Sequence, residues 1–170
     1  MFIGLHDIDQ GFKDRMFYWR AKINKLHNLF RVRDHWVDFA LYWMIFDAYL
    51  TKISRKDQDG ERLSYFFNNE HDFKKCIQEQ QCWQGLLSPY IKKLKEKSPT
   101  ADMRPNKGEP VYLNDENSVK EVFNFIYQIR CNLFHGAKNI KDPKNDALVF
   151  NAAKFMEGSF EYIDKWQDTL

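Results

Sequence analysis

The sequence contains little cysteine and little glycine, and each shortage excludes a class of protein. Its 170 residues include three Cys and seven Gly. Cys76, Cys82 and Cys131 are odd in number and lack the spacing of a metal site. We therefore expect buried or free thiols in a reducing compartment, with no disulfide framework and no metal or other cofactor. The low glycine content, beside 44% hydrophobic and 16% aromatic residues, favours a helical globular chain over a disordered one.

The chain also lacks a long apolar run and a secretory leader. Its most apolar stretch, from Trp36 to Leu50, is short for a bilayer span and is interrupted by Asp38 and Asp47. The first seven residues, Met-Phe-Ile-Gly-Leu-His-Asp, contain no basic segment and no long apolar segment, so no signal peptide is predicted. We expect a soluble, cytoplasmic protein that has no membrane partner.

An excess of charge of one sign is absent as well. The net charge is +2, so overall charge gives no argument for nucleic-acid binding. Two stretches are locally basic: residues 11–33 hold seven Lys and Arg against Asp14, and residues 92–97 hold four Lys against Glu96. Runs of this kind are typical of solvated helix surface.

Apolar residues at helical spacing predict an all-α fold. We expect one domain over residues 1–170, with a core over about 11–168, built as a bundle of five or six helices. The helices are predicted at about 11–30, 35–53, 69–97 (one helix or two, kinked near Pro89), 119–135 and 145–166. Residues 56–60 are predicted to form a turn, and residues 98–117 a long irregular connection of the kind that is often functional or mobile.

The helix predicted at 35–53 is apolar almost all round, with Asp34 as its N-cap, and is therefore expected at the centre of the bundle. The helix after the long connection has a start signal and a stop signal. Ser118 and Glu121 have the spacing of a capping box, and Gly136 can end the helix.

This last helix carries the candidate chemistry. One apolar stripe should face the core; it consists of Val119, Val122, Ile126, Ile129 and Leu133. Arg130 lies at the edge of the stripe, and His135 lies roughly 140° further round the helix. Between them Tyr127, Cys131 and Phe134 form a second apolar ridge. The ridge suits a two-fold contact between identical chains, although core packing is an equal alternative.

The segment Arg130-Cys-Asn132-Leu-Phe-His135-Gly136 resembles the R-x4–6-H motif of the HEPN superfamily of small helical-bundle domains. Residues 43–49 also resemble the central helix of that family, and the segment from Asp146 to Ala152 resembles the helix that follows its motif. The resemblance covers about residues 11–168, and the motif helix is its specific part.

The resemblance implies a metal-independent endoribonuclease that acts as a homodimer on RNA, as a toxin or defence effector with an antitoxin or regulatory protein as a further partner. It implies that Arg130 and His135 are catalytic. Asn132 would orient them by hydrogen bonds, and Lys138 and Arg20 would contact RNA. These roles fit the chemistry, because His titrates near neutral pH and a planar Arg can bind phosphate through two nitrogens.

Two other interpretations of the segment remain open. The chain could be a non-catalytic HEPN-like module that binds RNA, a nucleotide or a protein; Cys131 favours this, because the family often has a polar residue there. It could also be a helical interaction protein in which Arg130 pairs with a carboxylate such as Asp47 or Glu121 and His135 caps the helix. His6, His27, His35 and His71 have no evident partner in the sequence and are expected in surface or core packing.

Overall fold

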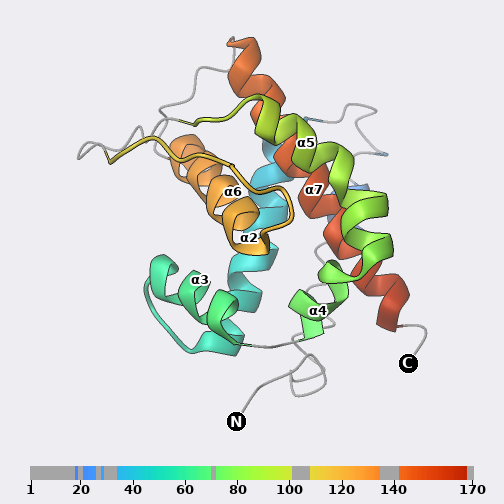
Figure 1. Cartoon of the computed structure of the whole chain (residues 1–170). Coiled ribbons are helices and arrows are strands. Elements are labelled where there is room, and N and C mark those ends of the chain that lie inside the picture. Colours follow the sequence, from blue (N-terminus) through green and yellow to red (C-terminus); the bar gives the residue numbers. More distant parts are fainter. Residues whose placement is uncertain are drawn as a thin grey trace.

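The computed structural model describes residues 18, 21–25, 28, 34–69, 72–100, 108–134 and 142–167. Its helices are α2 (His35–Ser54), α3 (Asp59–Asn68), α4 (Asp72–Gln78), the π-helix η2 (Gln81–Leu87), α5 (Ser88–Glu96), α6 (Val119–Phe134) and α7 (Pro143–Gln167) (Figure 1). The all-α prediction is confirmed, since the described part contains no strand apart from one isolated bridge between Thr100 and Val111. None of the described helices is long and apolar enough to cross a membrane.

Helix α2 packs against α3, α6 and α7, but Val37, Met44 and Ala48 leave one side of it exposed, so it is not enclosed all round as its apolar composition predicted. It begins where expected, because the Asp34 carboxylate accepts hydrogen bonds from the backbone N–H groups of Trp36 (2.9 Å) and Val37 (3.4 Å). It ends at Arg55, whose φ of 54° lies in the left-handed region. Large aromatic side chains on one face of the helix are buried, namely Phe39, Tyr42, Trp43, Phe46 and Tyr49.

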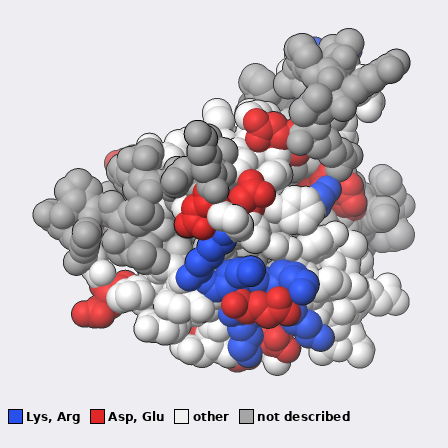
Figure 2. All heavy atoms as spheres, turned by 90° about the horizontal axis from the view of Figure 1, so that it is seen from above, with Lys and Arg blue, Asp and Glu red and all other residues white. Residues whose placement is uncertain are grey.

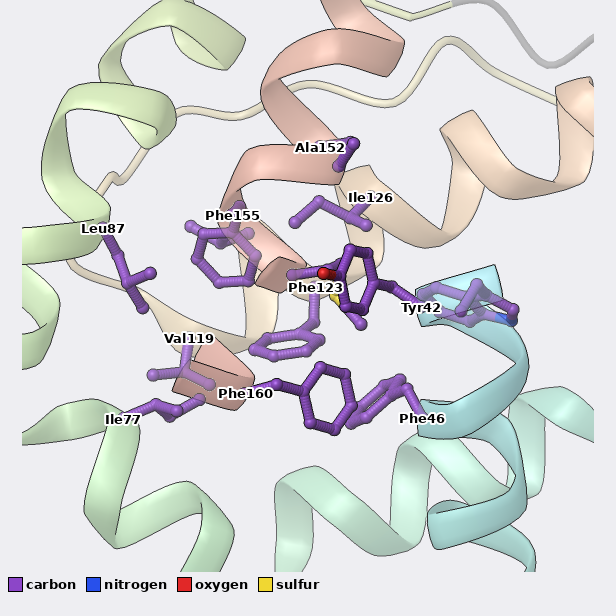
Figure 3. Packing of buried hydrophobic residues seen from close by; sticks show 14 of the residues in the cluster. Tyr42, Phe46, Ile77, Leu87, Val119, Phe123, Ile126, Ala152, Phe155 and Phe160 are labelled. Carbon is purple, nitrogen blue, oxygen red and sulfur yellow. The ribbon is translucent and has the colours of Figure 1, made fainter. Parts of the chain in front are cut away.

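The core is an aromatic cluster to which helices from the whole described chain contribute (Figure 3). Phe46 of α2 is its hub: its ring lies 5.1 Å from that of Phe123, 5.4 Å from Phe66 and 5.6 Å from Phe73. On α7, Phe155 meets Phe123 edge-on at 5.4 Å. Each such pair adds about 0.5–1.5 kcal/mol beyond the burial of apolar area, so this cluster fixes α2, α6 and α7 against one another.

Helices α2 and α6 pack with their chains running in opposite directions. Going forward along α2, from Trp43 to Phe46, the ring contacts go backward along α6, from Tyr127 (5.8 Å) to Phe123 (5.1 Å). By contrast α2 and α7 run the same way, since His35 contacts Phe150 and Tyr42 contacts Phe160. The N-terminal ends of α2 and α7 therefore lie at the same end of the bundle as the C-terminal end of α6, toward the top of Figure 1.

Helix α3 was not predicted. The sequence indicated a turn over residues 56–60, but the helix begins at Asp59 and buries Leu63 and Phe66. The turn is held from within α3, where the Arg62 guanidinium donates to the backbone oxygens of Lys56 (2.9 Å) and Asp57 (2.6 Å). Only four residues separate α2 from α3. The connection therefore ends before Asp59 and Gly60, which the sequence assigned to the turn.

The predicted helix at 69–97 is divided into α4, η2 and α5. The interruption expected near Pro89 lies earlier than predicted, because Pro89 occupies the first turn of α5, where its missing N–H costs nothing. Together with α3, the division gives seven named helices in the described part, besides the helical residues 18, 21–25 and 28, where five or six helices were expected in the whole chain. The irregular connection at 98–117 is confirmed over its described residues, 98–100 and 108–117.

The outer helices were located with uneven success. The last helix was expected at 145–166 and spans Pro143–Gln167. Of the helix predicted at 11–30, residues 18, 21–25 and 28 are described, and they are helical, with Ile23 buried. Cys76, Cys82 and Cys131 are free and buried, as expected, and burial raises the pKa of the Cys82 thiol to about 12.

Candidate functional site

Helix α6 carries the motif, and half of its predicted cap is present. The Ser118 hydroxyl accepts a hydrogen bond from the Glu121 N–H at 3.3 Å, as a capping box requires. The Glu121 carboxylate does not return the bond to Ser118. It accepts instead from the backbone N–H groups of Asn114 (2.9 Å) and Asp115 (3.0 Å). The irregular connection therefore folds back onto the first turn of α6. Its backbone binds the Glu121 carboxylate, which the sequence had predicted to accept from the Ser118 N–H.

The apolar stripe of α6 faces the core as predicted. Val119, Val122, Ile126 and Ile129 are buried, and Leu133 is half-buried against the same cluster. Arg130 lies at the edge of the stripe, with 22% of its side chain exposed. Its position thus leaves the guanidinium between the core and the solvent.

Arg130 is paired with a carboxylate that the sequence did not indicate. Its Nη1 lies 3.1 Å from Oδ2 of Asp59, at the start of α3. The other Asp59 oxygen lies 3.5 Å from Nη1 of Arg62, and Arg62 donates to Asp47 at 2.8 Å. Asp47, named above as a possible partner of Arg130, binds Arg62 instead. The four side chains form one alternating row of charges that joins α2, α3 and α6.

Two aromatic rings flank the Arg130 guanidinium. Its Cζ lies 4.9 Å from the ring centre of Phe134 and 5.9 Å from that of Tyr127, both within the range of cation–π attraction. Within the described part of the chain, the buried Nε of Arg130 has no hydrogen-bond partner. Asp59 and the two rings hold the guanidinium in one orientation while one of its donors stays unused.

Asn132 lies inside the protein. Its side chain is fully buried, its Oδ1 accepts from Gln128 Nε2 (3.0 Å), and its Nδ2 donates to Thr100 Oγ1 (3.4 Å). Thr100 is also the residue that bridges to Val111. Asn132 therefore joins the last turn of α6 to the irregular connection through side-chain hydrogen bonds, neither of which goes to Arg130.

The predicted dimer ridge is divided between core and surface. Cys131 is buried, Tyr127 is half-buried against Trp43, and Phe134 is 50% exposed. Burial, and after it the hydrogen bond with the Cys131 thiol, raises the pKa of Tyr127. Of the three residues, Phe134 offers the most surface to a partner. Three other predicted site residues, Arg20, His135 and Lys138, lie outside the described residues, as does Gly136.

A second ionisable pair lies at the end of the bundle where α6 ends. His35 Nε2 lies 2.8 Å from Oδ1 of Asp146, and Trp36 Nε1 donates to the same oxygen at 2.9 Å. His35, which has no evident partner in the sequence, therefore finds one where α2 packs against α7. The partners are 111 positions apart in the sequence, so no local spacing could have revealed them.

The basic run of residues 92–97 lies on α5. Lys92, Lys93, Lys95 and Lys97 are exposed, and Lys93 forms an ion pair with Glu96 at 3.1 Å. Figure 2 shows that Lys and Arg gather in one area of the upper face, with acidic side chains among them. This arrangement agrees with a solvated helix surface.

A cavity of about 370 Å³ lies at the other end of α6, lined by Gln78, Gln80, Trp83, Gln84, Asn117 and Val119. Val119 precedes Arg130 by eleven residues, or about 16 Å of helix, so the cavity is separate from the motif end. In the described ranges, no three His, Cys, Asp or Glu side chains are grouped as metal ligands would be.

Comparison of the chain with protein-family models, with curated proteins and with solved structures finds no match.

Proposed function

We propose that this chain is a metal-independent endoribonuclease of HEPN type that works as a homodimer, with Arg130 and His135 as its catalytic residues. The observation that carries the proposal is the setting of Arg130. A guanidinium whose side chain is 22% exposed, at the solvent edge of the last turns of α6, is oriented by Asp59 and by two rings. His135 follows Phe134 in the sequence, five positions after Arg130.

The reaction proceeds through the RNA's own 2′-hydroxyl. Its oxygen attacks the adjacent phosphorus while the bond to the 5′-oxygen breaks, giving a 2′,3′-cyclic phosphate and a free 5′-hydroxyl. One proton leaves the 2′-oxygen and one reaches the 5′-oxygen, and an imidazole near neutral pH can move either. Negative charge grows on the non-bridging oxygens, where a positioned Arg stabilises it.

The ion pair with Asp59 is compatible with this role. A guanidinium has five N–H donors in a planar fork, so a carboxylate that takes Nη1 leaves other donors for a phosphate. Asp59 then fixes the direction of the fork, which reduces the reorganisation needed when a substrate arrives. Asn132, buried beneath the last turn of α6, acts as a positioning residue for the same end of the helix.

Exposed apolar side chains support the homodimer. Phe134, next to the Arg130 guanidinium, is 50% exposed, and on α2 Val37 and Met44 are 51% and 60% exposed. Contiguous apolar patches mark surfaces that meet a partner, and we propose that these three side chains belong to one such patch. A second copy of the chain would bring two Arg130 side chains into one site, and an antitoxin or regulatory protein would compete for the same surface.

The second candidate function is a non-catalytic module that binds RNA, a nucleotide or a protein. The specific observation in its favour is the same ion pair, which favours a structural Arg130 and a protein as the ligand, because Asp59 neutralises part of the charge that a phosphate would meet. In that case Arg130 and Asp59 hold α6 to α3, and removing either residue should have the same effect.

The test uses purified chain incubated with mixed RNA in EDTA, and compares the wild type with Arg130→Ala, His135→Ala and Asp59→Asn. We expect the wild type to cut RNA and the Arg130 and His135 variants to lose at least about 100-fold of the rate, the usual effect of a positioned catalytic group. Asp59→Asn removes the same ion pair but keeps the guanidinium, so it should still cut. Lys120→Ala, which removes an exposed cation from the first turn of α6, is the matched control and should be unaffected.

Three outcomes contradict the proposal. Absence of cutting by the wild type, with RNA bound, points to the binding module. Equal loss in Arg130→Ala and Asp59→Asn points to a structural ion pair. Loss of helical circular dichroism in both Arg130→Ala and Asp59→Asn would likewise show that the ion pair is structural.

A further inference from the structure

One face of helix α2 is both apolar and exposed. Val37 and Met44 are 51% and 60% exposed, Ala48 is exposed, and Leu41 is half-buried. These four residues, here called the α2 seam, follow one another at intervals of four, three and four positions. At 100° per residue they lie within about 60° of arc on the helix. The core of the chain takes the opposite face of α2, on which Phe46 lies.

The spacing of the α2 seam indicates the kind of partner that fits it. Apolar residues at alternating steps of three and four are the a and d positions of a heptad, through which one helix packs against another in a coiled coil. No helix of the described part covers this seam, because Val37 and Met44 keep at least half of their surface exposed. A second helix with the same spacing would bury these side chains.

The same helix of a second copy fits the seam when it runs in the opposite direction. In one register Val37 lies against the partner's Ala48, and Leu41 lies against the partner's Met44. Two-fold symmetry repeats both contacts with the roles exchanged. The first layer pairs a larger side chain with a small one, and the second contains the adaptable thioether of Met. The α2 seam is therefore complementary to itself, as a two-fold contact between identical chains requires.

Charges at the two ends of α2 favour this antiparallel direction. Asp34 precedes the first turn and Lys52 lies in the last turn, and both are exposed. By helical periodicity the two stand on the same flank of the seam. The antiparallel register brings Lys52 to within about 1.5 Å of the height of the partner's Asp34, twice by symmetry. A parallel pairing would set each charge against its own copy and would align the two helix dipoles.

The other flank of the α2 seam carries Asp47. From Asp47 the row of charges continues through Arg62 and Asp59 to Arg130. A two-fold antiparallel pairing of facing helices keeps each flank on one side of the dimer, so the rows of both copies lie on the same side. A parallel pairing would turn the two rows to opposite sides. The direction of the seam therefore determines whether two Arg130 side chains can share one surface.

We propose that a second copy of this chain docks on the α2 seam, with the two α2 helices antiparallel and each Lys52 beside the partner's Asp34. This inference rests on the homodimer of the proposed function and names the surface that forms it. It applies to a nuclease and to a binding module alike, because burial of the seam requires no substrate.

The first experiment is sedimentation equilibrium of the full chain at about 1–100 µM, the range in which a small interface dissociates. Met44→Lys places a charge in both central layers of the seam, so the dissociation constant of the dimer should rise at least about 100-fold. Tyr112→Lys, at a side chain that is 54% exposed on the irregular connection, is the matched control. It should leave the dissociation constant within about 3-fold of the wild type.

A second experiment tests the charges. Lys52→Glu should weaken the dimer about 5-fold, because two like-charged pairs replace two opposite ones. Adding Asp34→Asn should recover most of this loss, since the amide removes the repulsion and still caps α2. A loss that Asp34→Asn leaves unchanged contradicts the antiparallel register.

A third experiment tests the direction of the helices by disulfide cross-linking. Val37→Cys and Ala48→Cys are oxidised separately and as a mixture, while the three native thiols stay buried. The antiparallel register predicts a cross-link between the two variants in the mixture and little cross-linking of either variant alone. A parallel pairing predicts that each variant cross-links with itself.

The outcomes separate this inference from the proposed nuclease. A wild type that is monomeric at about 100 µM overturns both the seam and the homodimer, whatever its action on RNA. A dimer that Met44→Lys leaves within about 3-fold of the wild type overturns the seam alone. A dimer that responds as expected but cuts no RNA supports the seam, and then only the nuclease fails. If Met44→Lys loses its helical circular dichroism, Ala48→Glu in the outer layer replaces it.

Discussion

Arg130 Nη1 and Asp59 Oδ2 lie 3.1 Å apart and join the last turns of α6 to the first turn of α3. The two side chains are 22% and 30% exposed, so solvent weakens their attraction. The pair is too exposed to be a major source of stability, yet it fixes the direction in which the guanidinium points. It also connects the motif to Arg62 and Asp47, which brings three helices into one row of charges.

A double-mutant cycle measures how much this pair stabilises the fold. For Arg130→Gln, Asp59→Asn and the combined variant, urea unfolding should give a coupling free energy of about 0.2–1 kcal/mol, as found for partly exposed ion pairs. A coupling near 3 kcal/mol would mean a buried, structural pair and would weaken the case for Arg130 as a phosphate ligand.

Asn132→Ala should destabilise the fold. The substitution leaves the buried Gln128 amide and the Thr100 hydroxyl without this partner, which costs about 1–3 kcal/mol of unfolding free energy. Asn124→Ala on the same helix, at a partly exposed position, is the control and should change it by less than about 0.5 kcal/mol. Equal effects of the two substitutions would show that the buried amide does not secure the irregular connection.

The lowered pKa of Asp146 predicts a pH-dependent stability. Its folded-state pKa lies below the ordinary value, so the carboxylate stabilises the fold above that ordinary value, and the contribution is lost as the pH falls through the lowered one. The melting temperature of the wild type should therefore exceed that of Asp146→Asn near pH 7, and the difference should shrink toward pH 3 as the carboxylate protonates. Glu109→Gln controls for the loss of one exposed carboxylate. A difference that stays constant with pH would contradict the assigned cause.

Phe134→Asp should shift the chain from dimer to monomer in sedimentation equilibrium. A charge at this exposed ring would have to be desolvated in an interface, whereas in the monomer it stays in water. Tyr112→Asp, at a side chain that is 54% exposed, is the control and should leave the oligomeric state unchanged. A wild-type chain that sediments as a monomer, or a Phe134→Asp dimer as tight as the wild type, would exclude this ring from the contact.

The sequence by itself determined the main helices. Asp34 before an apolar run fixed the start of α2, and the apolar stripe of α6 identified its buried face, because caps and helical periodicity act within a few residues of the chain. It missed α3, where tertiary burial of Leu63 and Phe66 stabilises a helix that the Gly and Asp content did not favour. It also assigned the wrong donor to the Glu121 carboxylate, since the backbone N–H groups that bind it belong to the connection, which folds back from outside the helix.

Only the tertiary structure decided which side chains meet at the motif end. Arg130 was recognised from its place on α6, but its partner Asp59 lies 71 positions earlier, and His35 and Asp146 lie 111 positions apart. Such pairs arise from the packing of helices against one aromatic cluster, and no periodicity within a single helix encodes them. Spacing along the chain selects the helix and the face on which a side chain stands, and the packing of α2, α3, α6 and α7 then selects its neighbours.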